Sequence, residues 1–271
     1  MNMKLSLTLA AITTLVAPAA MAATITVDDF DTTGAVISAV QGNPASNAFA
    51  GAGILGGERY MWASTDSAAL AGTSFEVVAG SGAVSFTNGT GITGQAVLVY
   101  DGVGTGVSTE AFTFNSVPAG PEFPDANTAL IPVNTTGLGG VNLLVSGSVA
   151  TSTFNFDVNS FDANSDVDFR AYAWDMNGNV ATYFENLLNP TNLDIVTFDT
   201  SLRLDEFTFG AGFDWTDIGA LAFSVESNST EFDGSLGAIS VVPLPASALL
   251  LLGGLGGLTA ASRRRRKDRK A

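Results

Sequence analysis

Short segments in which apolar and polar residues alternate recur along most of this chain, and they predict that it folds as β-sheet. In Ser152–Val158, Phe154, Phe156 and Val158 would face one side of a strand and the polar residues between them the other. Glycine-containing turn signals separate the segments, and helical periodicity is scarce. These patterns restrict the body of the chain to an all-β fold.

The strand candidates are Thr24–Asp28, Arg59–Ser64, Ser74–Ala79, Ala83–Thr87, Gln95–Asp101, Val141–Gly147, Ser152–Val158, Val167–Trp174, Asn179–Phe184, Ile218–Glu226 and Gly237–Val242. Many short strands rich in Phe, Val and Thr favour two packed antiparallel sheets, so we expect one β-sandwich domain over residues 23–241 with a jelly-roll-like topology. Asp175–Asn179 is predicted as a hairpin turn. Prolines mark a long loop over Asn115–Leu138, which carries function, moves, or divides two subdomains.

The 271 residues include no cysteine and no histidine. This excludes disulfides, thiol nucleophiles, Cys- or His-ligated metals and a Ser-His-Asp triad. A glycosidase would need two carboxylates at a defined separation, and no close acidic cluster lies on one predicted strand face. We therefore expect a protein that is not an enzyme, with a glycoside hydrolase as the least favoured alternative.

Charge is segregated along the chain, because seven of the eleven Lys and Arg residues lie in the last nine positions. From Ala23 to Val242, 25 acidic residues face three basic ones, Arg59, Arg170 and Arg203, which gives this region a net charge of −22. Such a body repels nucleic acid and anionic lipid. It suits cations or, as the simpler interpretation, solubility in a salty medium.

The N-terminus has the parts of a secretory signal peptide. Lys4 supplies the charge, Leu5–Val16 the apolar core, and Ala20 and Ala22 the small residues at positions −3 and −1. We expect residues 1–22 to be removed, so that the exported body begins at Ala23. An uncleaved anchor is the alternative.

The C-terminus also has three parts in order. A proline-containing motif, residues 242–246, precedes an uncharged Leu/Gly-rich segment that ends at Ser262. The uncharged span from Val241 is 22 residues, or about 33 Å if wholly helical, and it predicts a transmembrane helix over about 246–262. A basic cluster then keeps the tail cytoplasmic, so the acidic body faces outward. This stop-transfer cluster is Arg263, Arg264, Arg265, Arg266 and Lys267.

These three parts resemble the PEP-CTERM class of bacterial sorting signals, in the variant with a VPLPA motif. The motif residues here are Val242, Pro243, Leu244, Pro245 and Ala246, and the resemblance covers residues 242–271. It implies recognition by an exosortase, a transpeptidase-like membrane enzyme with a Cys nucleophile that cleaves near the motif. The prolines would keep the motif extended, as a protease requires of its substrate. A plain membrane anchor with a proline-capped helix is the alternative.

An acidic segment offers a candidate metal site. Asp162, Asn164 and Asp166 alternate, as oxygen ligands do in a calcium loop. An EF-hand is excluded, because Val167 and Ala173 stand where that loop needs Gly and Glu. Calcium is thus the one cofactor the sequence suggests, and an acidic turn before a strand is the simpler alternative.

The next strand offers a candidate glycan-binding face. Asp168, Arg170, Tyr172 and Trp174 would share one side of a regular strand. Aromatic rings stack on the C–H surfaces of sugars, and charged groups bind hydroxyls. Two aromatic residues on one face of another strand extend this face: Tyr60 and Trp62. The alternative is that the rings are core or cover and that Arg170 pairs with an aspartate.

Two hypotheses follow for the body. The first is a non-enzymatic protein that is exported, held in the inner membrane as an intermediate, and sorted by an exosortase-like enzyme to the cell surface or extracellular matrix. The second is a carbohydrate-binding module for exopolysaccharide, with or without calcium. Neither involves nucleic acid. Exposure of Tyr172 and Trp174 would favour the second hypothesis over the first.

Overall fold

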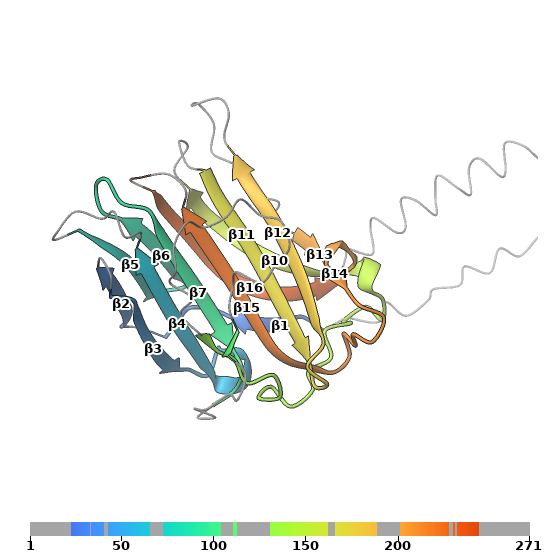
Figure 1. The fold of residues 1–271 in the computed structure, drawn as a ribbon. Helices are drawn as coiled ribbons and strands as arrows, with labels where there is room; N and C mark the ends of the chain where they lie inside the picture. Colours follow the sequence, from blue (N-terminus) through green and yellow to red (C-terminus); the bar gives the residue numbers. More distant parts are fainter. Residues whose placement is uncertain are drawn as a thin grey trace, which may run out of the picture.

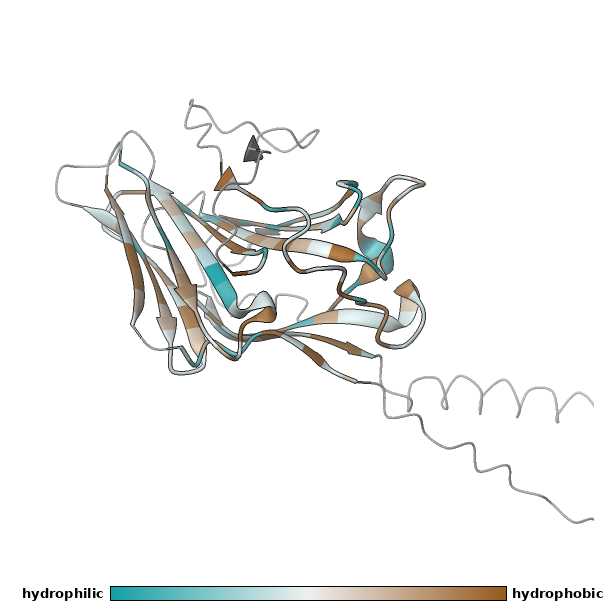
Figure 2. Ribbon diagram, turned by 90° about the horizontal axis from the view of Figure 1, so that it is seen from below, coloured by the Kyte–Doolittle hydropathy of each residue, from teal (hydrophilic) through white to brown (hydrophobic). Residues whose placement is uncertain are grey.

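The chain folds as two packed antiparallel sheets, which confirms the predicted β-sandwich (Figures 1 and 2). The computed structural model describes residues 23–32, 34–40, 43–65, 73–103, 111–112, 131–161, 166–188, 201–227, 230 and 232–243. No helix in these residues is long and apolar enough to span a bilayer. The predicted signal peptide, with Ala20 and Ala22, and the segments from Leu244 onward, with the stop-transfer cluster, lie outside the described residues.

Sheet A has seven strands, and β1 lies beside β16 off the main path. In spatial order the strands are β13 (Ser201–Arg203), β10 (Ser152–Phe161), β16 (Asp233–Pro243), β6 (Ala83–Asn88), β5 (Ser74–Gly80) and β2 (Ala35–Val40), with β1 (Ile25–Asp28) pairing to β16.

Sheet B also has seven strands. Their order is β14 (Thr208–Phe209), β12 (Val180–Leu188), β11 (Asp166–Asp175), β15 (Ile218–Ser227), β7 (Gly94–Tyr100), β4 (Glu58–Thr65) and β3 (Ala45–Ala50). A two-residue pairing joins β8 (Ala111–Phe112) to β9 (Ile131–Pro132), and three short 3-10 turns are η1 (Leu55–Gly57), η3 (Val149–Thr151) and η4 (Leu204–Glu206).

One predicted strand, Val141–Gly147, is wrong. The segment forms local turns instead, in which the Asn142 side chain accepts a hydrogen bond from the Leu144 N–H and Gly147 takes a left-handed φ of 78°. An asparagine that bonds nearby backbone competes with a strand ladder, and this outweighs the apolar content of the segment. The predicted hairpin turn is confirmed, because the Asp175 N–H bonds the Asn179 carbonyl.

Strands β2 and β3 were not predicted. In β2 buried and exposed residues alternate strictly, but Val36 and Val40 are apolar residues on the exposed side. Because both faces carry apolar residues, the hydropathy pattern does not reveal the period of two. In β3 small residues predominate, and most of them are exposed.

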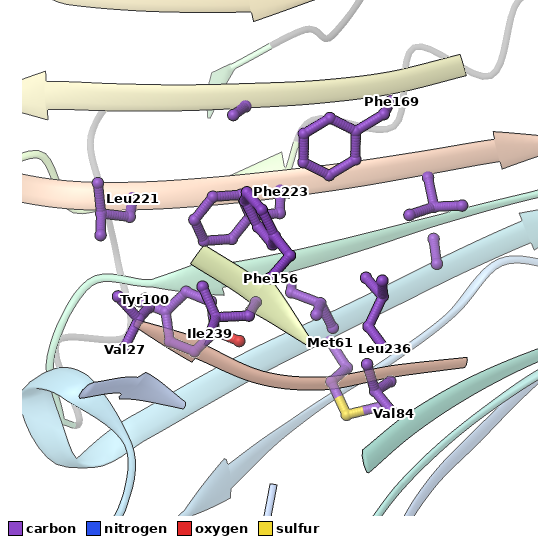
Figure 3. Packing of buried hydrophobic residues seen from close by; sticks show 14 of the residues in the cluster. Val27, Met61, Val84, Tyr100, Phe156, Phe169, Leu221, Phe223, Leu236 and Ile239 are labelled. Carbon is purple, nitrogen blue, oxygen red and sulfur yellow. The ribbon is translucent and has the colours of Figure 1, made fainter. Parts of the chain in front are cut away.

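The core between the sheets combines aliphatic side chains with a group of contacting aromatic rings (Figure 3). Phe156 of sheet A meets two rings of sheet B edge-to-face, with centroids 5.2 Å from Phe169 and 5.4 Å from Phe223. Phe154, two residues away on β10, also contacts Phe223, at 5.6 Å. Such edge-to-face pairs add about 0.5–1.5 kcal/mol each to the burial of apolar area.

The first and last strands of the body pair with each other. Ile25 lies opposite Val241, and the strands are antiparallel, so the start of β1 and the end of β16 lie at the same end of sheet A. Val242 and Pro243, the first two residues of the predicted sorting motif, belong to β16 and lie opposite Thr153 and Ser152 of β10. The fold therefore extends into the motif itself.

A fully buried ion pair joins the two sheets. Asp28 on β1 pairs with Arg59 on β4, and both side chains are inaccessible to solvent. The Asp28 carboxylate also accepts a hydrogen bond from the Tyr100 hydroxyl at 2.9 Å and one from the Phe30 N–H at 2.8 Å. The Arg59 guanidinium lies 5.1 Å from the centre of the Phe30 ring, a cation–π distance.

Burial is the main influence on the pKa values of Asp28 and Tyr100 in this cluster. It raises the pKa of Asp28 above its usual value of 3.8, although Arg59 and the three hydrogen bonds lower it. Burial and the Asp28 charge also raise the pKa of Tyr100 well above its usual range. Desolvation therefore outweighs pairing at Asp28, as expected for a carboxylate removed from water.

We expect Arg59→Met to lower the free energy of unfolding by about 3–5 kcal/mol at pH 7, because it leaves the Asp28 carboxylate buried without its cation. The change also removes a group that lowers the pKa of Asp28, so that pKa rises further. A folded-state pKa above the unfolded value stabilises the fold below about pH 4 and loses that effect as pH rises. The deficit should thus be small near pH 4 and full at pH 7 in urea unfolding followed by tryptophan fluorescence.

The control is Asp28→Asn combined with Arg59→Met, which removes both charges. It should regain most of the lost stability, and its difference from the wild type should not grow between pH 4 and 7. An equal loss in both variants at every pH would show that the charge pairing is not what Arg59 contributes.

Candidate functional site

The predicted glycan-face residues do lie on one side of a sheet, the outer face of sheet B. On β11, Val167, Phe169, Ala171 and Ala173 point into the core, so the alternating residues point outward. The outward residues are Asp168, Arg170, Tyr172 and Trp174.

The strand register extends this face over β12, β15, β7 and β4. Tyr172 lies opposite Ala222, which lies opposite Val99, which lies opposite Tyr60. Trp62 belongs to the same apolar cluster as Tyr172 and Trp174. The prediction that Tyr60 and Trp62 extend the face is therefore confirmed.

The rings of this face are covered. Tyr172, Trp174 and Trp62 expose only 1%, 4% and 7% of their surface, and Ile131 and Val133 are buried in the same cluster. We call Trp62, Tyr172, Trp174, Ile131 and Val133 the ring cluster. Tyr172 and Trp174 stack on each other with centroids 5.9 Å apart. The interpretation of these rings as covered residues, rather than as an open sugar platform, is the one that the structure bears out.

Backbone contacts of the segment that follows Val133 hold the cover in place. The Asn134 N–H donates to Asp101 Oδ2 at 2.7 Å, and the Leu138 N–H donates to the Gly219 carbonyl at 2.8 Å. A Cβ on Gly219 would lie 1.7 Å from the Thr135 carbonyl oxygen, so only glycine permits this approach. Burial, with a smaller contribution from Glu58, raises the pKa of Asp101, and the Asn134 N–H opposes this effect.

Beside the ring cluster lies a group of paired charges, the charged cluster, formed by Asp168, Arg170, Glu226 and Asn186. Arg170 donates to Glu226 at 2.9 Å and to Asp168 at 3.2 Å, and Asn186 donates to Asp168 at 2.6 Å. Asp168, Arg170 and Glu226 are all buried. The prediction that Arg170 pairs with an aspartate is confirmed, and Glu226 is a second partner.

Charge and burial also set the state of Tyr172. Burial and the Glu226 charge raise its pKa to about 12, and the Arg170 charge opposes them. The phenol is therefore neutral throughout the physiological range. Phe184 lies over the same guanidinium, with its ring centre 4.9 Å from Arg170 Cζ. It is 39% exposed and is the accessible aromatic residue next to the charged cluster.

Sequence reasoning missed Glu226, Asn186 and the cover. Glu226 was inside a predicted strand, but its place opposite Asp168 depends on which strands pair, and the sequence does not give that order. Ile131 and Val133 lie in the predicted long loop, where the short apolar segment Leu130–Val133 was the available signal.

The calcium prediction falls largely outside the described residues. Asp162 and Asn164 are not among them, and Asp166 is the first residue of β11. Within the part of the chain that the structure describes, no three acidic side chains come together as a metal site. Calcium binding by Asp162, Asn164 and Asp166 stays a prediction.

No protein-family profile and no curated protein matches the sequence. Solved structures that are similar to the chain include two carbohydrate-binding modules. The family 11 carbohydrate-binding module of the cellulosomal cellulase Lic26A-Cel5E of Clostridium thermocellum has 13% identity and a TM-score of 0.31, over 82% of this chain and 95% of that chain. A family 11 carbohydrate-binding module from Clostridium thermocellum in complex with a β-1,3-1,4-mixed-linked tetrasaccharide has 14% identity and a TM-score of 0.31, over 82% and 96%. At this distance, function has to be argued from the residues of this chain.

We expect Gly219→Ala to displace the segment after Val133 and to uncover the ring cluster. The added methyl group would overlap the Thr135 carbonyl, and such overpacking costs about 1–3 kcal/mol. Iodide quenching of tryptophan fluorescence should therefore increase. The control is Gly210→Ala, where no atom lies within 4 Å of the added Cβ. Equal quenching in the two variants would contradict the anchoring role of Gly219.

Proposed function

We propose that the chain is a non-enzymatic exported protein of the cell surface or extracellular matrix. In this proposal residues 1–22 direct export, a helix over about 246–262 holds an inner-membrane intermediate, and an exosortase-like enzyme processes the chain at Val242–Ala246. We also propose a jelly-roll-like topology, because the chain crosses repeatedly between sheets A and B.

The pairing of β1 with β16 is the observation that carries the proposal. Because Ile25 lies opposite Val241, both ends of the body lie at one end of the sandwich. A signal peptide before Ala23 and a membrane segment after Pro243 would then meet the same membrane. At about 3.3 Å per residue, the three residues from Pro243 to Ala246 hold the body within about 10 Å of the bilayer.

The described side chains support a role without catalysis. Asp168 and Glu226 are neighbouring acidic residues on the outer face of sheet B, and both accept hydrogen bonds from Arg170. The two buried carboxylates thus serve as ionic partners of one buried guanidinium. Beside them the Tyr172 and Trp174 rings are covered, and Phe184 is exposed.

Replacing both motif prolines, Pro243→Ala with Pro245→Ala, tests the sorting step. We expect the variant to remain at full length in the membrane fraction, whereas the wild type is shortened at its C-terminus, because the motif loses the residues that keep it extended. Immunoblotting of cell fractions with an N-terminal epitope tag placed after Ala23 gives the readout. Pro118→Ala is the matched control, and normal shortening of the motif variant would refute the proposal.

A second candidate function, carbohydrate binding at the outer face of sheet B, has its own observation in favour. Phe184 presents an exposed ring against Arg170, beside the carboxylates of the charged cluster. A ring and paired charges at one place suit a sugar, which has apolar C–H faces and hydroxyl groups. The ring cluster would join such a site only if Ile131 and Val133 moved away.

Phe184→Ala tests this second candidate. If exopolysaccharide of the host stacks on this ring, the variant should bind roughly tenfold more weakly in co-sedimentation, as expected for the loss of about 1.4 kcal/mol. Phe209→Ala is the matched control, because Phe209 is also 39% exposed but lies on β14. Measurements with calcium and with chelator also test the prediction at Asp162–Asp166. Unchanged binding in Phe184→Ala, or no binding by the wild type, would exclude this site.

A further inference from the structure

Two edge strands lie on the same side of the sandwich (Figure 1). Strand β2 ends the order of sheet A and β3 ends the order of sheet B, six residues each. The strands that end the two sheets on the opposite side are shorter, since β13 has three residues and β14 has two. An edge strand carries backbone N–H and C=O groups that can pair with another chain.

The β2 edge lacks the residues that usually prevent such pairing. No charged residue occurs from Thr32 to Gly57, and β2 contains no proline. Its outward face is apolar, with Val36 48% and Val40 43% exposed. On the opposite side, by contrast, β13 carries the exposed Arg203. Short length and charge are ways in which proteins protect an edge, and β2 has neither.

The backbone of β2 is oriented for pairing. Val40 exchanges both its N–H and its C=O with Asn43, at 3.3 and 2.9 Å, on the side away from β5. In an antiparallel strand each residue directs both groups to one side, and alternate residues share that side. Val36 and Ser38 therefore direct their backbone groups toward the open edge. Asn43 closes one end of the edge, and the left-handed Gly34, with φ of 83°, turns the chain at the other.

We propose that a second copy of this chain pairs along β2, antiparallel about a two-fold axis at Ile37. This register sets Val36 opposite Ser38 of the partner subunit and Ser38 opposite Val36 of the partner subunit. The open backbone groups of both residues are then satisfied, and Asn43 stays clear of the second strand. The pairing joins the two copies of sheet A into one continuous sheet.

A second copy fits this edge better than an unrelated partner. A two-fold interface must be self-complementary, and an axis at Ile37 meets this condition because each Val36 then lies opposite a Ser38. A basic partner would be drawn to the acidic surfaces of a body with net charge −22 and not to an uncharged strand. The nearest acidic side chain, Glu76, is set back on β5 opposite Ser38. The two Glu76 groups would lie about three strand spacings apart, roughly 14 Å, which exceeds the screening length of about 8 Å at physiological salt.

Cysteine cross-linking of the full chain in non-ionic detergent tests the register, and the natural chain has no cysteine to interfere. In Val36→Cys combined with Ser38→Cys, directly opposed residues come within the Cα separation that a disulfide needs. We expect a disulfide-linked dimer as the main species on a non-reducing gel. The matched control on the opposite edge of sheet A is Ser201→Cys with Arg203→Cys, also two exposed residues spaced by two, and it should stay monomeric. Equal cross-linking in both would overturn the proposal.

A charge variant gives an independent test. Val36→Lys adds an edge charge and removes an exposed apolar side chain, so it should abolish the concentration-dependent rise in mass measured by sedimentation, and Ser201→Lys should not. Raising salt should strengthen the wild-type association, because it screens two acidic bodies. The pairing would be overturned if the Val36→Cys, Ser38→Cys variant formed no cross-link and the wild type and Val36→Lys showed the same dependence of mass on concentration. That result would leave the sorting proposal intact, because sorting is measured by C-terminal shortening.

Discussion

The buried pair of Asp28 and Arg59 is the contact on which the architecture depends. It joins β1 of sheet A to β4 of sheet B, the Tyr100 hydroxyl and the Phe30 N–H also bond the Asp28 carboxylate, and the Phe30 ring lies against the guanidinium. Within the described residues, Arg59 Nε and Nη2 are buried without a hydrogen-bond partner, so the guanidinium depends on Asp28 for its charge, and the pair holds the start of the body in one position. That position places β1 against β16 and brings the two ends of the body together.

The small number of basic residues in the body also determines the charge of its surface. The body has three basic residues, and two of them, Arg59 and Arg170, are buried in ion pairs. The third, Arg203, is exposed and pairs with Asp205 and Glu206 nearby. The described surface is consequently dominated by carboxylates. Copies of this protein repel one another wherever they carry charge, which leaves uncharged edges such as β2 as the places for contact.

Sheet B has apolar residues on both faces. Its inner face packs on sheet A, and its outer face carries the ring cluster, in which three aromatic side chains are buried together with Ile131 and Val133. The close approach of the chain over Gly219 makes this second layer possible. A face rich in aromatic residues is therefore not by itself a binding surface, because the chain can use it to attach its own loop.

The sequence alone determined the fold class, most strands and the composition of the outer face. A period of two is a local property, so Tyr172 and Trp174 could be assigned to one side of β11 from the order of residues. The sequence also excluded catalysis or metal binding by histidine and cysteine, because the chain contains neither residue.

Tertiary structure decided burial and partners. Strand order made Glu226 the partner of Arg170, and the return of the chain at Ile131 placed that residue in one buried cluster with Trp174. Both pairs lie far apart in the sequence. The edges at β2 and β3 were also invisible beforehand, since a strand becomes an edge only when no neighbour pairs with it. Pattern within a segment is set by local geometry, whereas exposure depends on what the rest of the chain places against it.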